Sequence, residues 1–325
     1  MAENLLEVNN LKTYFFTRSG VVKAVDDVSF VMKPGETLGV VGESGCGKSV
    51  TALSVMRLVT TPPGKIVGGE IILSGENILE KSKDELTDIR GSKMSMIFQD
   101  PMSSLNPVFN VGFQIAETVK RHRKGISNDQ AWKRAVEMLD LVRISDAKRR
   151  AKNFPHEFSG GMRQRVMIAI ALACNPQLLI ADEPTTALDV TIQAQVLELM
   201  NGLSKEFGTA VMLITHDLGV VAGTCKYVNV MYAGHIVESA PVKQIFESPA
   251  HPYTVGLLKS IPRMNESRGE KLTPISGQPP DLGKEIIGCP YAPRCPRVQA
   301  RCREERPTLQ SVGRGDQVAA CFYPY

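Results

Sequence analysis

The chain has 325 residues, of which 43% are hydrophobic and 22% are charged, an ordinary composition for a globular protein with one large domain or two. Its net charge of +4 is too small to argue for nucleic acid as a partner. Residues 1–8 carry two acidic side chains, and no run approaches the roughly 20 apolar residues of a membrane helix. We therefore expect a cytoplasmic chain without a secretory signal that does not itself cross a membrane.

Short apolar runs separated by turns open the chain. The pattern predicts strands at residues 5–8, 21–25 and 28–31, and a turn at Pro34-Gly35. Tyr14, Phe15 and Phe16 form an aromatic cluster between them. On pattern alone, this cluster suits core packing and stacking on a nucleotide base equally well.

A glycine-rich loop lies between a predicted buried strand at residues 37–41 and a predicted helix from Val50 to Val59. The loop fits the pattern G-x-x-x-x-G-K-[ST] and consists of Gly42, Glu43, Ser44, Gly45, Cys46, Gly47, Lys48 and Ser49. Its glycines let backbone N–H groups surround phosphate oxygens at a helix N-terminus. We expect Lys48 to reach the β- and γ-phosphates and the Ser49 hydroxyl to bind Mg²⁺.

The next elements mix strands and helices. The sequence predicts a turn and strand at residues 68–73, a helix at 83–90 and a strand at 94–98 that ends in Gln99. Two helices follow at 111–121 and 129–141, and Ser127 and Asp129 occupy N-cap positions of the second one. Residues 148–150 are expected to form a solvated basic face. Gln99 is either a plain strand-end amide or a group delivered to the nucleotide.

Ser159, Gly160 and Gly161 open a predicted helix that runs to about Cys174. A serine and two glycines at a helix start favour anion binding, although most such triplets are turns.

Two later apolar strands end in polar side chains. Residues 178–181 lead into Asp182 and Glu183, and residues 210–215 lead into His216. An acid pair at a strand end can cap a helix, but beside a phosphate-binding loop it is the Walker B arrangement. Asp182 is then expected to hold Mg²⁺ and Glu183 to polarise the attacking water. Ligands of doubly wound sheets bind at this edge, which favours a functional His216.

Seven cysteines are present, and three of them, Cys46, Cys174 and Cys225, are scattered. The other four, Cys289, Cys295, Cys302 and Cys321, cluster in a proline-rich tail with little apolar content for a core. A cytosolic cysteine cluster favours a metal site, and four thiolates suit zinc or an iron–sulfur cluster. The spacing is wider than in zinc knuckles. Unliganded thiols are the third alternative.

The order of these motifs resembles the nucleotide-binding subunit of an ABC transporter. The motifs are GESGCGKS, Gln99, FSGGMRQR, LLIADE, Ala187-Leu188-Asp189 and His216. A closer resemblance is to the dipeptide/oligopeptide importer ATPases of bacteria and archaea. It rests on GVVKAVDDVSF, MSMIFQDPMSSLNP, HEFSGGMRQRVMIAIAL, residues 248–254 and the cysteine tail, and it covers essentially the whole chain.

The resemblance implies an α/β fold, a P-loop NTPase of ABC type. The fold would have an N-terminal antiparallel β layer, an inserted helical subdomain at about residues 100–175 and a small C-terminal cysteine-rich extension. The implied domains are an ATPase domain at residues 1–250 and a metal-binding extension at residues 251–325.

The resemblance also implies roles for matched residues. Residues 42–50 would hold the triphosphate, and Phe15, or alternatively Tyr14, would stack on the base. Mg²⁺ would be bound by Ser49, Asp182 and Gln99, and Gln99 would also sense the γ-phosphate and couple to membrane subunits. Glu183 would be the catalytic base, and His216 would contact the γ-phosphate. Ser159, Gly160 and Gly161 would contact the nucleotide of the opposite ATPase, and Asp189 would help to join the two halves. Phe158 departs from the usual leucine of this motif, with little expected consequence.

The expected function is ATP hydrolysis that powers import of di- or oligopeptides at the cytoplasmic face of a membrane. The implied partners are two permease subunits, a second ATPase (a copy or a paralogue) and an extracytoplasmic binding protein. The implied cofactors are ATP, Mg²⁺ and a [4Fe–4S] cluster, with zinc as the alternative. Import of nickel or another small solute is an alternative function. A soluble ABC ATPase outside transport is disfavoured, because the chain has one set of motifs and no long heptads.

Overall fold

A computed structural model describes residues 4–100, 104–185, 189–260 and 275–325. The chain forms two compact units. The first unit contains the residues up to Leu5, residues 32–36 and residues 74–213, and the second contains residues 6–31, 37–73 and 214–325.

Parallel strands form the centre of the first unit. Strands β6 (Met94–Ile97) and β7 (Leu178–Asp182) run parallel, with Met94 opposite Leu178 and Ile97 opposite Ala181. Strand β8 (Ala210–Thr215), most of which belongs to this unit, is the other neighbour of β7. Every residue of β7 and β8 is buried, as expected for strands covered on both faces. The polar residues Gln99 and Glu183 therefore follow strands that end at the same edge.

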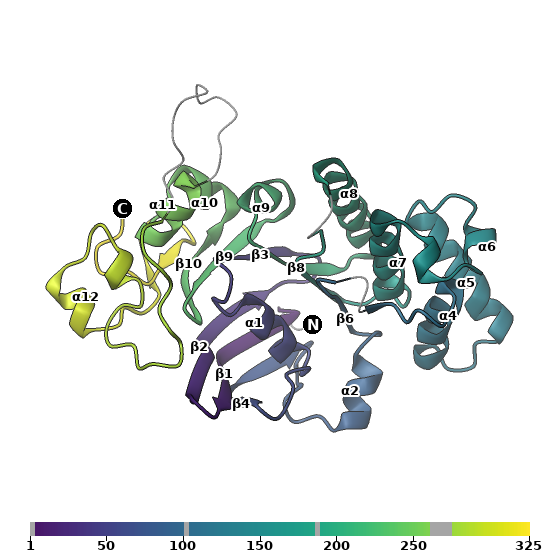
Figure 1. The fold of residues 1–325 in the computed structure, drawn as a ribbon, viewed down its shortest axis with the longest axis horizontal. Coiled ribbons are helices and arrows are strands. Elements are labelled where there is room, and N and C mark those ends of the chain that lie inside the picture. Colours follow the sequence, from purple (N-terminus) through teal and green to yellow (C-terminus); the bar gives the residue numbers. More distant parts are fainter. Residues whose placement is uncertain (1–3, 101–103, 186–188, 261–274) are drawn as a thin grey trace. The chain divides into compact units, whose positions relative to one another are not determined.

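Helices make up most of the rest of the first unit. Helices α4 (Val111–His122), α5 (Asn128–Leu141) and α7 (Gly160–Leu172) pack against one another, and Figure 1 shows them as a helical group with α6 (Ala147–Arg150). This group is the helical subdomain. The remaining elements are β5 (Glu76–Asn77), α2 (Lys83–Ile89), η1 (Pro155–Glu157) and α8 (Val190–Phe207).

Helix α5 begins with a reciprocal pair of capping bonds. Ser127 is the N-cap, and its hydroxyl accepts a hydrogen bond from the Gln130 amide nitrogen, while the Gln130 side chain bonds back to the Ser127 amide. Asp129 instead lies in the first turn, where its charge favours the helix N-terminus. Of the two N-cap residues that the sequence predicts, Ser127 is confirmed.

The second unit begins with an antiparallel layer in the order β2-β1-β4. These strands are β1 (Leu6–Thr17), β2 (Gly20–Met32) and β4 (Gly64–Leu73). They are longer than the sequence predicts, and Gly68 and Gly69 lie inside β4 rather than in a turn. The register between β1 and β4 shifts between Asn9 and Lys12, and Gly69 has a φ of 91° there. The glycines thus mark a β-bulge, which sequence alone does not separate from a turn.

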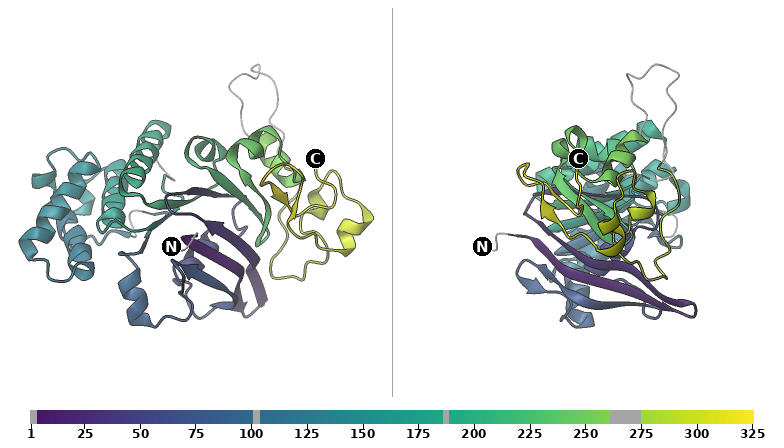
Figure 2. Two further views of the ribbon diagram at one scale, coloured as in Figure 1. Left: turned by 180° about the vertical axis from the view of Figure 1, so that it is seen from behind. Right: turned by 90° about the vertical axis from the view of Figure 1, so that its left-hand side faces the viewer.

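Five further strands of this unit carry the phosphate-binding loop and the C-terminal segment. They lie in the order β3-β9-β10-β12-β11, for β3 (Thr37–Val41), β9 (Tyr227–Tyr232), β10 (His235–Pro241), β11 (Gln310–Ser311) and β12 (Val318–Ala319). Strands β3 and β9 are parallel, and β12 pairs antiparallel with β10. Figure 2 shows the yellow C-terminal segment beside the green strands. The C-terminal segment is therefore built onto the sheet that carries the loop.

The helices of the second unit are short. They are α1 (Lys48–Val55), α9 (Leu218–Thr224), α10 (Val242–Glu247), α11 (Pro252–Lys259), η2 (Ala292–Arg294) and α12 (Ala300–Glu304). Helix α1 ends before the predicted Val59, because Arg57 adopts a left-handed φ of 51°.

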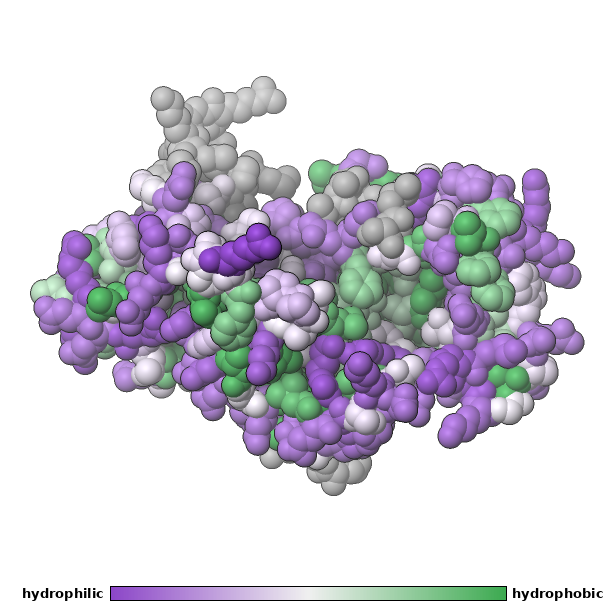
Figure 3. Space-filling view, turned by 60° about the horizontal axis from the view of Figure 1, so that its bottom comes forward, coloured by the Kyte–Doolittle hydropathy of each residue, from purple (hydrophilic) through white to green (hydrophobic). Residues whose placement is uncertain are grey.

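A membrane-spanning helix needs roughly 20 mostly apolar residues. Within the described ranges, none of the helices is both long enough and apolar enough to cross a membrane. On the face drawn in Figure 3, hydrophobic residues gather in small groups among hydrophilic ones.

Candidate functional site

The loop at residues 42–49 joins β3 to α1 and has a shape that two glycines impose. Gly42 has a φ of 154°, and a Cβ there would lie 2.2 Å from the Met231 carbonyl oxygen. Gly47, the N-cap of α1, has a φ of 107°, and its Cβ would lie 2.4 Å from the Ala24 carbonyl oxygen. No other residue type fits these positions without moving the backbone. The loop and the first turn of α1 thus form a cradle of amide groups suited to phosphate.

Lys48 is held inside this loop and is only 5% exposed. Its Nζ donates to the carbonyl oxygens of Gly42, at 2.8 Å, and Glu43, at 2.9 Å. The ammonium group is therefore held by the backbone of the loop, close to the place where phosphate oxygens would bind.

Cys46 occupies a buried position in the same loop. Burial raises the pKa of its thiol above the ordinary value, which keeps it protonated and unreactive.

The aromatic residues of β1 differ in their surroundings. The Tyr14 hydroxyl donates to Oδ1 of Asp26 at 2.7 Å, and burial together with this bond raises the pKa of Tyr14 to about 12. The Phe15 ring instead lies near Gly64, where an added Cβ would approach Phe15 Cε1 to 3.0 Å. Both side chains are partly exposed. The choice of Phe15 over Tyr14 for base stacking stays a prediction.

In the first unit, the structure brings Gln99 and Glu183 together. Gln99 Nε2 donates to Glu183 Oε2 at 3.1 Å. Glu183 has a left-handed φ of 45°, an uncommon conformation for this residue type, whereas Asp182 ends β7 and is 6% exposed. The two successive carboxylates therefore differ in backbone geometry, which suits separate tasks.

The serine-glycine-glycine motif and Asp189 line one cavity of about 400 Å³. Ser159 is the N-cap of α7, and its hydroxyl makes no capping bond, while Asp189 caps α8 by accepting from the Ile192 amide at 3.0 Å. Arg143 and Arg165 also line the cavity. The N-terminus of α7 and the two arginines favour an anion in this cavity, whereas the Asp189 carboxylate, which caps α8, opposes it.

Sequence reasoning gives no role to Arg143, because a loop arginine between helices carries no motif that could reveal it. Within the Ala187-Leu188-Asp189 motif, only Asp189 lies in the described part of the chain.

His216 follows the end of β8 in the second unit. Its neighbour Asp217 caps α9 by accepting from the amides of Gly219, at 2.8 Å, and Val220, at 3.3 Å. The Asp217 amide donates to the Thr215 hydroxyl at 3.0 Å. The backbone on both sides of His216 is therefore fixed, while the function of His216 stays a prediction.

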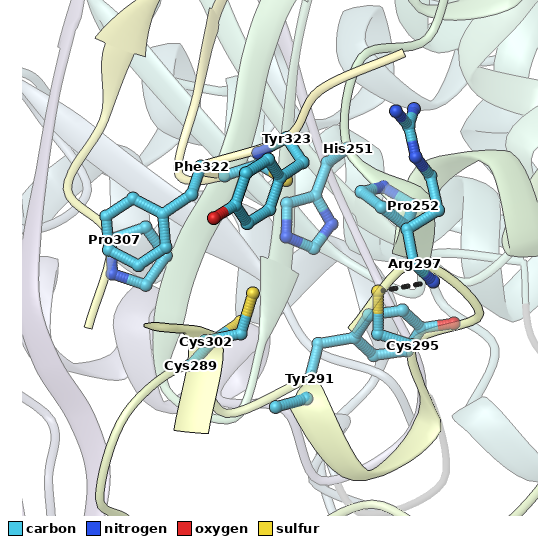
Figure 4. Close-up of a pocket in the computed structure, with 12 residues that line it drawn as sticks. His251, Pro252, Cys289, Tyr291, Cys295, Arg297, Cys302, Pro307, Phe322 and Tyr323 are labelled. Atoms are coloured by element: carbon cyan, nitrogen blue, oxygen red, sulfur yellow. Dashed lines mark hydrogen bonds between the residues drawn. The ribbon is translucent and has the colours of Figure 1, made fainter. Parts of the chain in front are cut away.

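The four C-terminal cysteines line one small pocket, shown in Figure 4. Backbone amides two residues further on bond to the sulfurs of Cys295 and Cys321, both at 3.4 Å. Burial raises the pKa of the Cys289 thiol to about 11, although the Tyr291 amide opposes this shift. All four are free thiols in this structure.

The four thiols line the same pocket but do not form a metal-binding group there. Among the described residues, no group of three or more His, Cys, Asp or Glu side chains could hold a metal ion, so the structure gives no support to the expected [4Fe–4S] cluster or to zinc.

Two further residues contact the phosphate-binding loop, although the sequence predicts no such contact for either. The Arg294 guanidinium pairs with the Glu43 carboxylate, and the Tyr253 hydroxyl accepts from the Glu43 amide. Both lie far along the chain from Glu43, at separations of 251 and 210 residues, so no local pattern links them.

Comparisons with known proteins identify two family models in this chain. One, described as ABC transporter, matches residues 25–186, and the other, described as oligopeptide/dipeptide transporter, C-terminal region, matches residues 237–302.

Named relatives match nearly the whole chain. The oligopeptide transport ATP-binding protein OppD of Salmonella typhimurium is 51% identical over 323 residues, which cover 99% of this chain and 95% of that protein. The oligopeptide transport ATP-binding protein AppD of Bacillus subtilis is also 51% identical, over 98% of this chain and 97% of that protein.

Solved structures share the fold. A dimeric ATP-binding cassette in a post-hydrolysis state with ADP and Pi has a TM-score of 0.65 and 28% identity, over 73% of this chain and 98% of that chain. The CbiO1 protein of Clostridium perfringens, part of an ABC transporter complex, has a TM-score of 0.64 and 25% identity, over 76% of this chain and 92% of that chain.

Proposed function

This chain belongs to the ABC transporter family, and we propose that it is the ATP-hydrolysing subunit of an importer for dipeptides or oligopeptides. The observation that carries the proposal is about 51% identity, over almost the full length, to relatives named as oligopeptide transport ATP-binding proteins. The match of residues 237–302 to the C-terminal region of oligopeptide/dipeptide transporters supports the substrate class independently.

Each residue proposed for the nucleotide has its own task. Residues 42–49 would bind the phosphates through backbone amides and Lys48, which would exchange its carbonyl partners for phosphate oxygens. Ser49, Asp182 and Gln99 would hold Mg²⁺, which neutralises phosphate charge when bound. Glu183 would accept the proton of the attacking water, and the Gln99 amide, already bonded to Glu183, would orient that carboxylate.

The cavity around Ser159 would complete the site of a second ATPase subunit. A helix N-terminus and Arg143 and Arg165 suit the charge of a γ-phosphate that is presented by the partner. ATP would then favour the closed dimer, because only that state makes both sets of phosphate contacts. The dimeric form of the solved ATP-binding cassette supports this arrangement.

The helical subdomain offers a surface for the permease. Phe109 and Phe113 are 42% and 41% exposed, and their rings stack with centroids 4.8 Å apart. Exposed aromatic pairs are typical anchors of protein interfaces. We propose that this pair contacts one of two membrane permease subunits, with the chain bound peripherally at the cytoplasmic face.

The cysteine pocket would hold a [4Fe–4S] cluster in a C-terminal extension at residues 251–325. Four thiols line one pocket, which is the donor set that such a cluster requires, and backbone N–H groups donate to two of the sulfurs. Burial raises the pKa of Cys295 and Cys321 above the ordinary value, and these hydrogen bonds oppose that shift. The spacing of the four cysteines in the sequence, which is wider than in zinc knuckles, favours the cluster over zinc.

Uptake in cells tests the proposed substrate. Loss of this subunit should abolish uptake of labelled oligopeptides, and the wild-type chain should restore uptake while Glu183→Gln should not. Unchanged peptide uptake together with lost nickel uptake would replace the peptide proposal by the alternative substrate and leave the ATPase assignment intact.

A further inference from the structure

Arg294 and Glu43 form a partly buried, bidentate ion pair. Arg294 Nη1 donates to Glu43 Oε2 at 2.6 Å, and Arg294 Nη2 donates to Glu43 Oε1 at 2.9 Å. The Arg294 side chain is 4% exposed and the Glu43 side chain 28%. A bidentate pair of this kind fixes the orientation of the carboxylate as well as its position. The second residue of the phosphate-binding loop is therefore held by the C-terminal segment.

Further hydrogen bonds hold the Arg294 side chain in place. Its Nε donates to the Ser276 carbonyl oxygen at 3.0 Å, and Nη1 also reaches the Tyr232 hydroxyl at 3.3 Å. The guanidinium carbon lies 5.8 Å from the centre of the Tyr232 ring. The arginine thus joins β9, the loop and two parts of the C-terminal segment.

The backbone of Glu43 is held from a second direction. The Glu43 amide donates to the hydroxyl of Tyr253, a side chain with 0% exposure, at 2.8 Å. Burial raises the pKa of Tyr253 well above its ordinary value, so this hydroxyl stays neutral and can accept the bond. The side chain and the amide of Glu43 are thus both held by hydrogen bonds. Its carbonyl oxygen accepts from Lys48 Nζ at 2.9 Å.

Arg294 is also connected through the backbone to the cysteine pocket. Arg294 ends η2, and the next residue is Cys295, which lines that pocket. At the other end of η2, Tyr291 packs against Tyr232 and Tyr253, with ring centroids 5.3 Å and 5.4 Å apart. We call residues 289–302 the cysteine loop. A change in the path of this loop would move the guanidinium group that holds Glu43, because Arg294 lies within it.

We infer that Arg294 is a positioning residue for ATP: through Glu43 it sets the shape of the phosphate-binding loop and makes nucleotide affinity depend on the C-terminal cysteine loop. Arg294 acts through Glu43 and does not itself bind a phosphate. The inference rests on ATP binding by the family fold and on no property of the transported substrate, so failure of the peptide proposal would leave it standing.

The test measures ATP affinity and steady-state hydrolysis of the full-length chain. Arg294→Gln should weaken ATP binding and raise KM about tenfold, equivalent to about 1.4 kcal/mol, with kcat within about twofold. Arg294→Lys should recover part of the affinity, because a lysine keeps the charge but not the two-pronged geometry. Arg303→Gln, an exposed arginine of the same segment, is the matched control and should bind ATP as the wild type does. Wild-type affinity in folded Arg294→Gln would overturn the inference.

A double-mutant cycle separates positioning from general damage to the fold. Glu43→Gln should lose about as much affinity as Arg294→Gln, and the double variant should lose little more, because both changes break one contact. Losses that add would contradict the proposed coupling. Glu43→Gln leaves the C-terminal sequence unchanged, so it also tests the contact if Arg294→Gln does not fold.

The link to the cysteine loop has its own measurement. Cys295→Ser should weaken ATP binding in the wild-type background and have little further effect in Arg294→Gln. Wild-type ATP affinity in Cys295→Ser would overturn the dependence on the cysteine loop, whereas the role of Arg294 would still be decided by the cycle.

Discussion

The Gln99 amide nitrogen lies 3.1 Å from Oε2 of Glu183 and donates a hydrogen bond to it. The two residues follow adjacent parallel strands, β6 and β7, so the sheet itself brings them together. Glu183 keeps a left-handed backbone at this point, with a φ of 45°. The bond engages one carboxylate oxygen of Glu183, and the geometry suits a base that is oriented by a neighbouring amide.

Replacing Glu183 with glutamine tests that role. Since a positioned general base contributes about 10²–10⁴-fold, Glu183→Gln should lower kcat by a factor in about that range. ATP binding should remain within about threefold of wild type, because the amide has the same size and the phosphate contacts lie elsewhere. Gln99→Ala is the companion variant and should lower kcat less. Full turnover by Glu183→Gln in a single-turnover assay would show that another group is the base.

The glycines of the phosphate-binding loop allow a matched steric test. In Gly42→Ala, the new Cβ would meet the Met231 carbonyl oxygen at 2.2 Å, so the loop must move. In Gly45→Ala, the φ of 77° is also unfavourable, but no atom lies within 4 Å of the new Cβ. Gly42→Ala should lower the free energy of unfolding by about 1–3 kcal/mol more than Gly45→Ala. Equal losses in urea unfolding would contradict the close approach of Gly42 to Met231.

His235 predicts a loss of stability in acid. Burial and the nearby Arg306 lower the pKa of His235 to about 4, although Asp26 and Asp27 act in the opposite direction. Arg306 Nη1 lies 3.1 Å and Asp26 Oδ2 lies 4.0 Å from His235 Nε2. The unfolded chain binds a proton near pH 6.5 and the folded chain does not until about pH 4, so stability falls as pH falls through this window.

The expected size can be checked by urea unfolding of two proteins at two pH values. From pH 7 to pH 5, the free energy of unfolding of the wild type should fall by about 2 kcal/mol through this one group. His235→Gln cannot take up the proton and should lose correspondingly less over the same interval. Identical pH dependence in both proteins would remove His235 as the cause.

The sequence predicts a structural element correctly where the residues of that element determine its conformation. The sequence predicts a strand at residues 210–215, and the structure has β8 at Ala210–Thr215, because a continuous apolar run is needed for burial on both faces. The ABC fold, with its antiparallel layer and helical subdomain, follows from several motifs in a fixed order.

Long-range contacts are beyond sequence reasoning. Arg294 lies in a segment with several arginines, and nothing local distinguishes it from Arg297 or Arg301. Only the folded chain places its guanidinium group on Glu43, 251 positions away. The turn that the sequence predicts at Gly69 is wrong for a related reason, since the bulge found there is caused by the register of the opposite strand, β1.

The exposed aromatic pair on the helical subdomain predicts a separation of ATPase activity from transport. Phe113→Ala should weaken co-purification with the permease subunits by about tenfold, the size expected for loss of an interface anchor. Basal hydrolysis by the isolated chain should be unchanged, because Phe113 lies outside the residues assigned to ATP. Ile287→Ala, another exposed apolar residue (73%), is the control for a general surface effect. Equal co-purification of the permease subunits with the wild type, Phe113→Ala and Ile287→Ala would exclude Phe113 from the interface.

Cysteine substitutions combined with metal analysis decide the nature of the C-terminal pocket. Protein purified without oxygen should be brown and contain about four irons with matching sulfide per chain. Cys302→Ser should lose iron, because Cys302 lines the pocket, whereas Cys225→Ser should retain it, because Cys225 is buried by β3 and α9 away from the pocket-lining residues. Removing iron from the wild type should lower its melting temperature to near that of Cys302→Ser, since metal binding contributes to folding free energy. About one zinc per chain would replace the cluster by a structural zinc site. A wild-type protein without metal would contradict both the cluster and the zinc site and would leave the four cysteines as unliganded thiols.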